Sequence, residues 1–209
     1  MGASFAGMKF NSWIGNVAVG EAIGIGVIGT LFHRLAVDGL QILQNDDANT
    51  LFVAVLAGVA EATSLSFFQW RILSRNFKVK YFRFWFFTAL PAALGWVLGY
   101  LPVIMNDDAG GGEEPSGSVV YLLYLLVVFA GAAMGFLFGI SQSQALPKDR
   151  RRKWIYGNVF GWACGLPLIF LAASLPGYED PSWKVFLFSM SGGAAAGVCL
   201  ALFTKRVFK

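Results

Sequence analysis

The sequence predicts an all-α integral membrane protein, folded as one six-transmembrane-helix bundle over residues 1–209. Hydrophobic residues make up 56% of the chain and charged residues only 13%, about half of the ~25% that soluble domains average. Six continuous apolar stretches each reach the ~20 residues that a helix needs to cross a bilayer. A membrane barrel would instead show alternating strands of about ten residues. Because the six stretches fill most of the chain, no separate soluble domain is expected.

The spans are predicted, in order, at about 13–36, 50–73, 81–105, 119–146, 154–175 and 183–203. Of the 16 basic residues, all but Arg34 and Lys184 lie before the first span or around the ends of the second, fourth and sixth. Cytoplasmic loops carry such an excess of Lys and Arg. We therefore expect cytoplasmic N- and C-termini in an inner or plasma membrane. The acidic Gly/Ser-rich segment 107–118 is interpreted as a solvated linker on the opposite side.

Short motifs predict an internal repeat. The first, third and fifth spans each contain two glycines four residues apart, and the second, fourth and sixth each contain a pair of small residues. Small residues at such spacings let helix backbones approach closely. We expect three pseudo-repeated helical hairpins around an axis along the membrane normal, with the sixth span pairing with the first. The motifs are Gly20–Gly24, Gly95–Gly99 and Gly161–Gly165, and Ala57–Gly58, Ala130–Gly131 and Gly192–Gly193.

Two acidic residues, Glu21 and Glu61, fall inside the predicted spans. A charge near the bilayer centre costs at least about 2.5–3.5 kcal/mol, so such residues are candidates for function. Helix rise places Glu21 roughly 12 Å above Trp13 and Glu61 roughly 15 Å above Arg71. The two acids are thus expected at similar depth on adjacent antiparallel helices. In the repeat, Glu21 stands where Trp96 and Trp162 stand in the other hairpins, and Glu61 stands where Met134 stands.

These acids predict an ion or proton site. Two close carboxylates cannot both stay ionised, so they would share a proton or hold a cation. Asn16, Thr63 and Ser64 would supply further oxygen atoms nearby. The alternative is that each Glu is protonated and forms hydrogen bonds between helices, with a structural role only. The sequence leaves both interpretations open.

Three functions fit these features. The first is a small transporter or channel-like protein that uses the acidic ion or proton site. The second is a non-catalytic accessory or scaffold subunit of a larger membrane complex. The third, an intramembrane lipid-modifying enzyme, is the least favoured, because Glu61 and Arg71 lie ~15 Å apart along their helix.

No catalytic motif or metal-ligand cluster is present, and the chain has a single histidine, so we expect no catalytic residues, no metal and no cofactor. The expected partners are the lipid bilayer, an ion or small solute, and membrane proteins or further copies of this chain. Nucleic acid is not expected, since membrane topology accounts for the basic residues.

Overall fold

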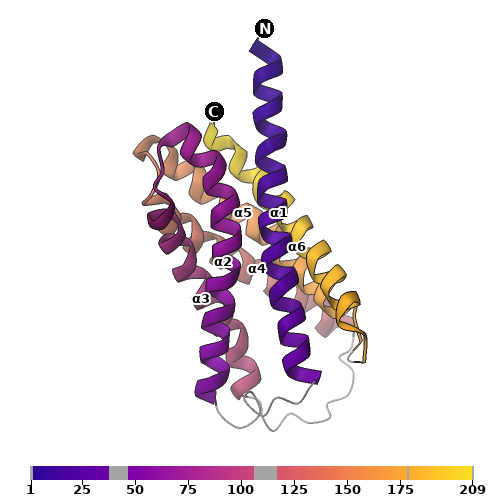
Figure 1. Ribbon diagram of the computed structural model, residues 1–209. Helices are drawn as coiled ribbons and strands as arrows, with labels where there is room; N and C mark the ends of the chain where they lie inside the picture. Colours follow the sequence, from indigo (N-terminus) through magenta and orange to yellow (C-terminus); the bar gives the residue numbers. More distant parts are fainter. Residues whose placement is uncertain (1, 38–46, 106–116, 178, 209) are drawn as a thin grey trace.

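The computed structural model describes residues 2–37, 47–105, 117–177 and 179–208 (Figure 1). Within them the protein is helical and has no strand, and each of six helices is long and apolar enough to cross a membrane. The predicted linker at 107–118 lies almost entirely outside the described residues. The elements are α1 (Gly2–Val37), α2 (Asp47–Phe77), α3 (Tyr81–Met105), α4 (Gly117–Ser143), α5 (Lys148–Ser174), α6 (Ser182–Thr204) and the 3₁₀ helix η1 (Lys205–Phe208).

Helix boundaries differ most from the prediction at the start of α1. This helix begins at Gly2, well before the expected residue 13, and projects beyond the rest of the bundle in Figure 1. No proline interrupts residues 2–12, so the helix continues N-terminally from its apolar part. The later boundaries follow local signals. α2 ends before Lys78, whose φ of 54° breaks the helix, while Pro147 and Pro181 immediately precede α5 and α6.

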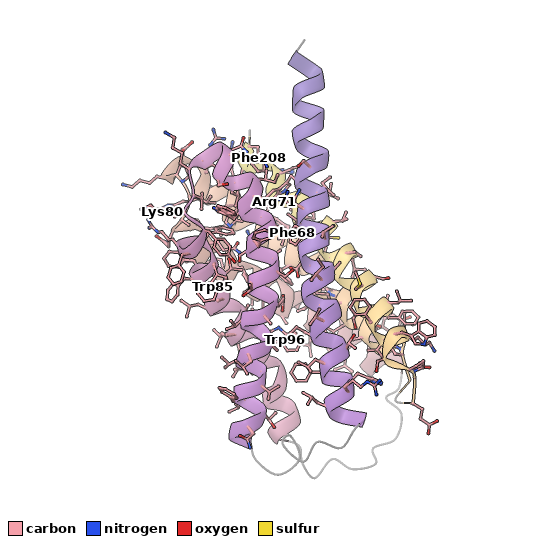
Figure 2. The ribbon with its side chains drawn as sticks, in the orientation of Figure 1. Phe68, Arg71, Lys80, Trp85, Trp96 and Phe208 are labelled. Carbon is pink, nitrogen blue, oxygen red and sulfur yellow. The ribbon has the colours of Figure 1, made fainter. Side chains whose placement is uncertain are left out.

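The helices form a closed ring in which each contacts its neighbours along the chain and α6 also contacts α1. The contact between α3 and α4 is the least extensive. Both chain ends lie at the same end of the bundle (Figure 1). Figure 2 shows Arg71 and Lys80 at that end too, and we call it the basic end.

An aromatic cluster joins four elements at the basic end. The ring of Trp154 in α5 lies 6.0 Å from that of Trp13 in α1 and 6.2 Å from that of Phe84 in α3. Phe208 in η1 completes the cluster, 5.2 Å from Trp13. The Arg150 guanidinium donates a hydrogen bond to the backbone carbonyl of Val207 in η1 at 3.1 Å. The inside of the bundle is therefore filled with side chains at this end.

Glycines set the closest approaches between helices. A Cβ added at Gly131 in α4 would lie 2.3 Å from the carbonyl oxygen of Trp162 in α5. One added at Gly193 in α6 would lie 2.6 Å from the carbonyl oxygen of Glu21 in α1. Real Cβ atoms do not approach backbone so closely, so only glycine permits these two contacts. The second of them fixes the backbone at the first candidate acid.

Candidate functional site

Two glycines bring α1 against α2 in the middle of the candidate spans. A Cβ at Gly20 would lie 3.2 Å from the Cα of Leu65, and one at Gly24 would lie 3.3 Å from the Cα of Glu61. Glu61 therefore packs beside Gly24, which lies three residues, or about 4.5 Å of helix rise, beyond Glu21. The structure brings the two acids close enough to interact electrostatically. We call Glu21 and Glu61 the acid pair.

Glu21 is enclosed completely. Its side chain has no exposed surface, with α2 packed against Gly20 and α6 packed against the Glu21 backbone. Neither carboxyl oxygen has a hydrogen-bond partner among the described residues. A buried polar group without a partner costs about 1–3 kcal/mol, and a charged one costs more. Glu21 therefore destabilises the bundle that contains it unless something binds it.

Glu61 is nearly as buried, at 5% exposed, but it has a partner. The indole Nε1 of Trp96 in α3 donates to Glu61 Oε2 at 2.5 Å. The Trp96 ring also stacks on Phe32 of α1, with centroids 5.4 Å apart and planes at 9°. Figure 2 shows Trp96 between the ribbons of α1 and α2. One indole thus connects three helices and holds one carboxyl of the acid pair.

The three hydroxyl and amide candidates bond mainly to nearby backbone. Ser64 Oγ donates to the Gly20 carbonyl at 2.7 Å, so it lies at the α1–α2 contact next to the acid pair. Thr63 is exposed on the outer side of α2, where its hydroxyl donates to Val59. Asn16 Nδ2 donates to the Ser12 carbonyl, one turn towards the basic end. Of the three, only Ser64 is placed directly beside the acids.

Further buried polar groups lie between the acid pair and the basic end, and the sequence interpretation did not include them in the site. The amide atoms of Gln69 and the Asn158 Oδ1 are buried there and have no hydrogen-bond partner among the described residues, and neither has the buried Trp162 Nε1 at the level of the acid pair. Gln69 lies one turn beyond Leu65, the residue packed on Gly20. Ordered water commonly satisfies such groups in protein interiors.

A spacing in the sequence would have revealed part of this polar interior. Gln69, Gln142 and Thr204 each follow a contact glycine by eleven residues, which is about three helical turns and returns to the same face. A polar residue on a glycine-packed face must point into the bundle. All three are buried. The glycines are Gly58, Gly131 and Gly193.

Gln142 and Thr204 have partners that Gln69 lacks. The indole of Trp154 donates to Gln142 Oε1 at 3.0 Å, and Gln142 Nε2 donates to Thr88 at 3.1 Å. The indole of Trp13 lies 3.3 Å from Thr204 Oγ1 and donates to it. The buried polar side chains near the basic end therefore include both bonded and unbonded amides.

No group of three or more His, Cys, Asp or Glu side chains in the described ranges is arranged to hold a metal ion. With only two carboxyls, the acid pair suits a proton or a singly charged cation better than a divalent metal, which takes more ligands. The chain matches no family model, and no curated protein or solved structure was found to be similar to it. The chemistry of the site must therefore be argued from its own residues.

Proposed function

We propose that this protein is a small multi-pass membrane transporter that binds a proton or a monovalent cation at the acid pair. The main support for this proposal is Glu21. Its carboxyl group is fully buried beside Glu61, and neither oxygen has a hydrogen-bond partner among the described residues. Ionisable residues at such depth are rare and mark ion or proton pathways. A site that only held helices together would give Glu21 a donor, as Trp96 does for Glu61.

The proposal includes insertion of all six helices, with the basic end facing the cytoplasm. The exposed side chains of the bundle support insertion, because large apolar residues cover its outer surface. Phe82 is 72% exposed and Phe129 64%. Arg83 near the start of α3, and Arg150 and Arg152 near the start of α5, lie at the basic end, which fits the excess of positive charge that cytoplasmic loops carry.

We also infer a threefold repeat, in a register that the contacts favour. Gly131 and Gly193 pack on the backbones of Trp162 and Glu21, while Gly58 packs on that of residues 92–93. The α3 equivalent of Glu21 and Trp162 is then Ala92, one helical turn before the Trp96 that the sequence motif suggests. In this register Phe84 is equivalent to Trp13 and Trp154. Gln69 lacks a partner because Phe84 offers no indole N–H.

The polar groups between the acid pair and the basic end support an access route from that side. Gln69 and Asn158 come from different helices, α2 and α5, and both leave polar atoms for water to satisfy. The aromatic cluster lies beyond them at the basic end. A gated transporter fits this closed end better than a continuously open channel does.

A scaffold role is the second candidate, and α4 favours it. Only 22% of its span is buried, the lowest share among the six. Its outer face is almost entirely apolar, with Tyr121 80% exposed. This face would bind another membrane protein or a second copy of the chain. Purification in several mild detergents tests this role, and a solitary monomer in all of them would contradict it.

Flux into proteoliposomes tests the transporter. An internal pH dye and a potassium gradient with valinomycin would report proton uptake, and sodium added at a constant potassium gradient would report cation dependence. We expect uptake by the parent protein to fall at least tenfold in Glu21→Gln and Glu61→Gln. Glu179→Gln, which removes an acid outside the helices, should leave uptake unchanged. Equal uptake in the parent and the Glu21→Gln/Glu61→Gln double variant would rule out the site.

A further inference from the structure

A groove on the outer surface of α5 and α6 lies away from the acid pair. It has a volume of about 120 Å³ and is open to the surroundings. Its position at the start of α5 and the end of α6 places it at the basic end. The lining residues are Lys153, Tyr156, Gly157, Phe160, Phe203 and Arg206. We call these six residues the cationic groove.

Gly157 forms the base of the cationic groove. A Cβ there would lie 2.8 Å from the Cα of Thr204, so α5 and α6 touch backbone to backbone at this level. On one side of this contact the rings of Phe160 and Phe203 stack across the two helices, with centroids 5.9 Å apart. Phe160 follows Lys153 by seven residues, or roughly 10 Å of helix rise. The groove therefore runs from a charged end to an aromatic end.

The charged end holds two cations from different helices without an acid between them. Lys153 and Arg206 both line the groove, and all six lining residues lack a carboxylate. The nearby Asp149 is already paired with Arg150 at 2.8 Å. Arg152 adds a third positive charge, with its guanidinium 5.6 Å from the centroid of the Tyr156 ring. The local field therefore favours an anion at this end.

We propose that the cationic groove binds one anionic glycerophospholipid of the cytoplasmic leaflet. Its phosphate lies between Lys153 and Arg206, and an acyl chain lies over Phe160 and Phe203. The groove is charged at one end and aromatic at the other, and this arrangement favours a lipid over free phosphate. Inorganic phosphate would contact only the cations and leave the aromatic end uncovered. Basic pockets between transmembrane helices on the cytoplasmic side bind lipid headgroups in this manner. The inference rests on the proposed membrane insertion and orientation, and it is independent of the acid pair.

Thermal unfolding in detergent tests the groove directly. The purified protein would be titrated with short-chain phosphatidylglycerol, with phosphatidylcholine of the same chain length, and with inorganic phosphate. We expect a saturable rise in Tm with phosphatidylglycerol only. Each basic residue near a membrane surface contributes about a fivefold gain in affinity for anionic lipid, so Lys153→Gln/Arg206→Gln should bind about thirtyfold more weakly.

The matched control is Arg75→Gln/Lys80→Gln, which removes one Arg and one Lys from exposed positions at the same end of the bundle. It should titrate like the parent. Equal weakening in both double variants would mean a diffuse attraction and overturn the site. A Tm rise with phosphate equal to that with phosphatidylglycerol would overturn the lipid. The Tm titration does not depend on the flux proposed for the acid pair, so failure of either proposal is seen separately.

Discussion

The α1–α6 and α4–α5 contacts use the same backbone packing and place different side chains on it. Gly193 packs on the Glu21 carbonyl in the first contact, and Gly131 packs on the Trp162 carbonyl in the second. The Trp162 ring then stacks on Phe138, with centroids 5.1 Å apart, and only its Nε1 lacks a hydrogen-bond partner, whereas neither oxygen of the Glu21 carboxyl has one among the described residues. A large ring at this position stabilises a helix pair, so helix packing does not require an acid there. The difference points to function as the reason for Glu21.

The largest losses of stability should come from substitution of the glycines on which both contacts depend. Gly131→Ala and Gly193→Ala each place a Cβ against a backbone carbonyl, which cannot move without shifting a helix. We expect each to lower the free energy of unfolding by about 2–3 kcal/mol, measured by denaturant titration in detergent. Gly99→Ala is the control, since nothing lies within 4 Å of its added Cβ. Similar losses in all three would contradict the packing argument.

Substitution by leucine at Glu21 and at Trp162 should change the free energy of unfolding in opposite directions. Glu21→Leu removes an unpartnered carboxyl and should raise the free energy of unfolding by about 1–3 kcal/mol. Trp162→Leu removes a stacked ring and should lower it by about 2–3 kcal/mol. The same unfolding titration measures both. If Glu21→Leu were as destabilising as Trp162→Leu, the acid would have a structural role.

The hydrogen bond from Trp96 to Glu61 can be tested by a smaller change. Trp96→Phe retains an aromatic ring against Phe32 and removes only the donor to Glu61, so we expect a loss of about 1–2 kcal/mol and an altered pH profile of flux. Trp85→Phe is the matched control. Its indole donates to Thr63 on the exposed side of α2, and its loss should cost less than half as much and leave the profile unchanged.

A partly exposed carboxylate, Asp180, should give the smallest effect and contrasts with the buried pair. Before α6, the Lys184 ammonium donates to Asp180 at 2.8 Å and lowers the pKa of that carboxyl below its ordinary value. A lowered pKa in the folded state stabilises the fold above the unfolded pKa of about 3.9 and loses this contribution as pH falls below it. Asp180→Asn should therefore reduce the drop in Tm between pH 5 and pH 3 by a few degrees at most. An unchanged drop would contradict the assignment.

Composition and the length of the apolar stretches alone predicted the helical class, because a continuous stretch of ~20 apolar residues is typical of a membrane-spanning helix. The similar depth of Glu21 and Glu61 was also predictable, since helix rise fixes depth. The partner of Glu61 was not, because Trp96 reaches it from α3 and no local pattern specifies which way an indole turns. The register proposed for α3 was not predictable either. Gly95 and Gly99 repeat the motif, yet a Cβ at Gly95 meets the flexible end of Met134, and one at Gly99 meets nothing within 4 Å.

Gln69 illustrates a second limit of the sequence. Its eleven-residue spacing from Gly58 could have placed it inside the bundle. In the register proposed above, its lack of a partner follows from Phe84 standing where α1 and α5 carry Trp13 and Trp154, and the contacts rather than the motifs suggest that register. Motifs of two glycines occur in every span pair, so sequence similarity alone cannot choose between registers one turn apart.

The indole of Trp96 gives this protein an optical reporter. Its N–H bond to Glu61 makes its emission sensitive to the charge of that carboxyl, while its stacking on Phe32 couples it to α1. With the other six of the seven tryptophans replaced by phenylalanine, emission wavelength and quenching would follow the proposed occupancy of the acid pair in real time. The proposed binding step could then be tested separately from transport in a single cuvette, without a label attached to the chain.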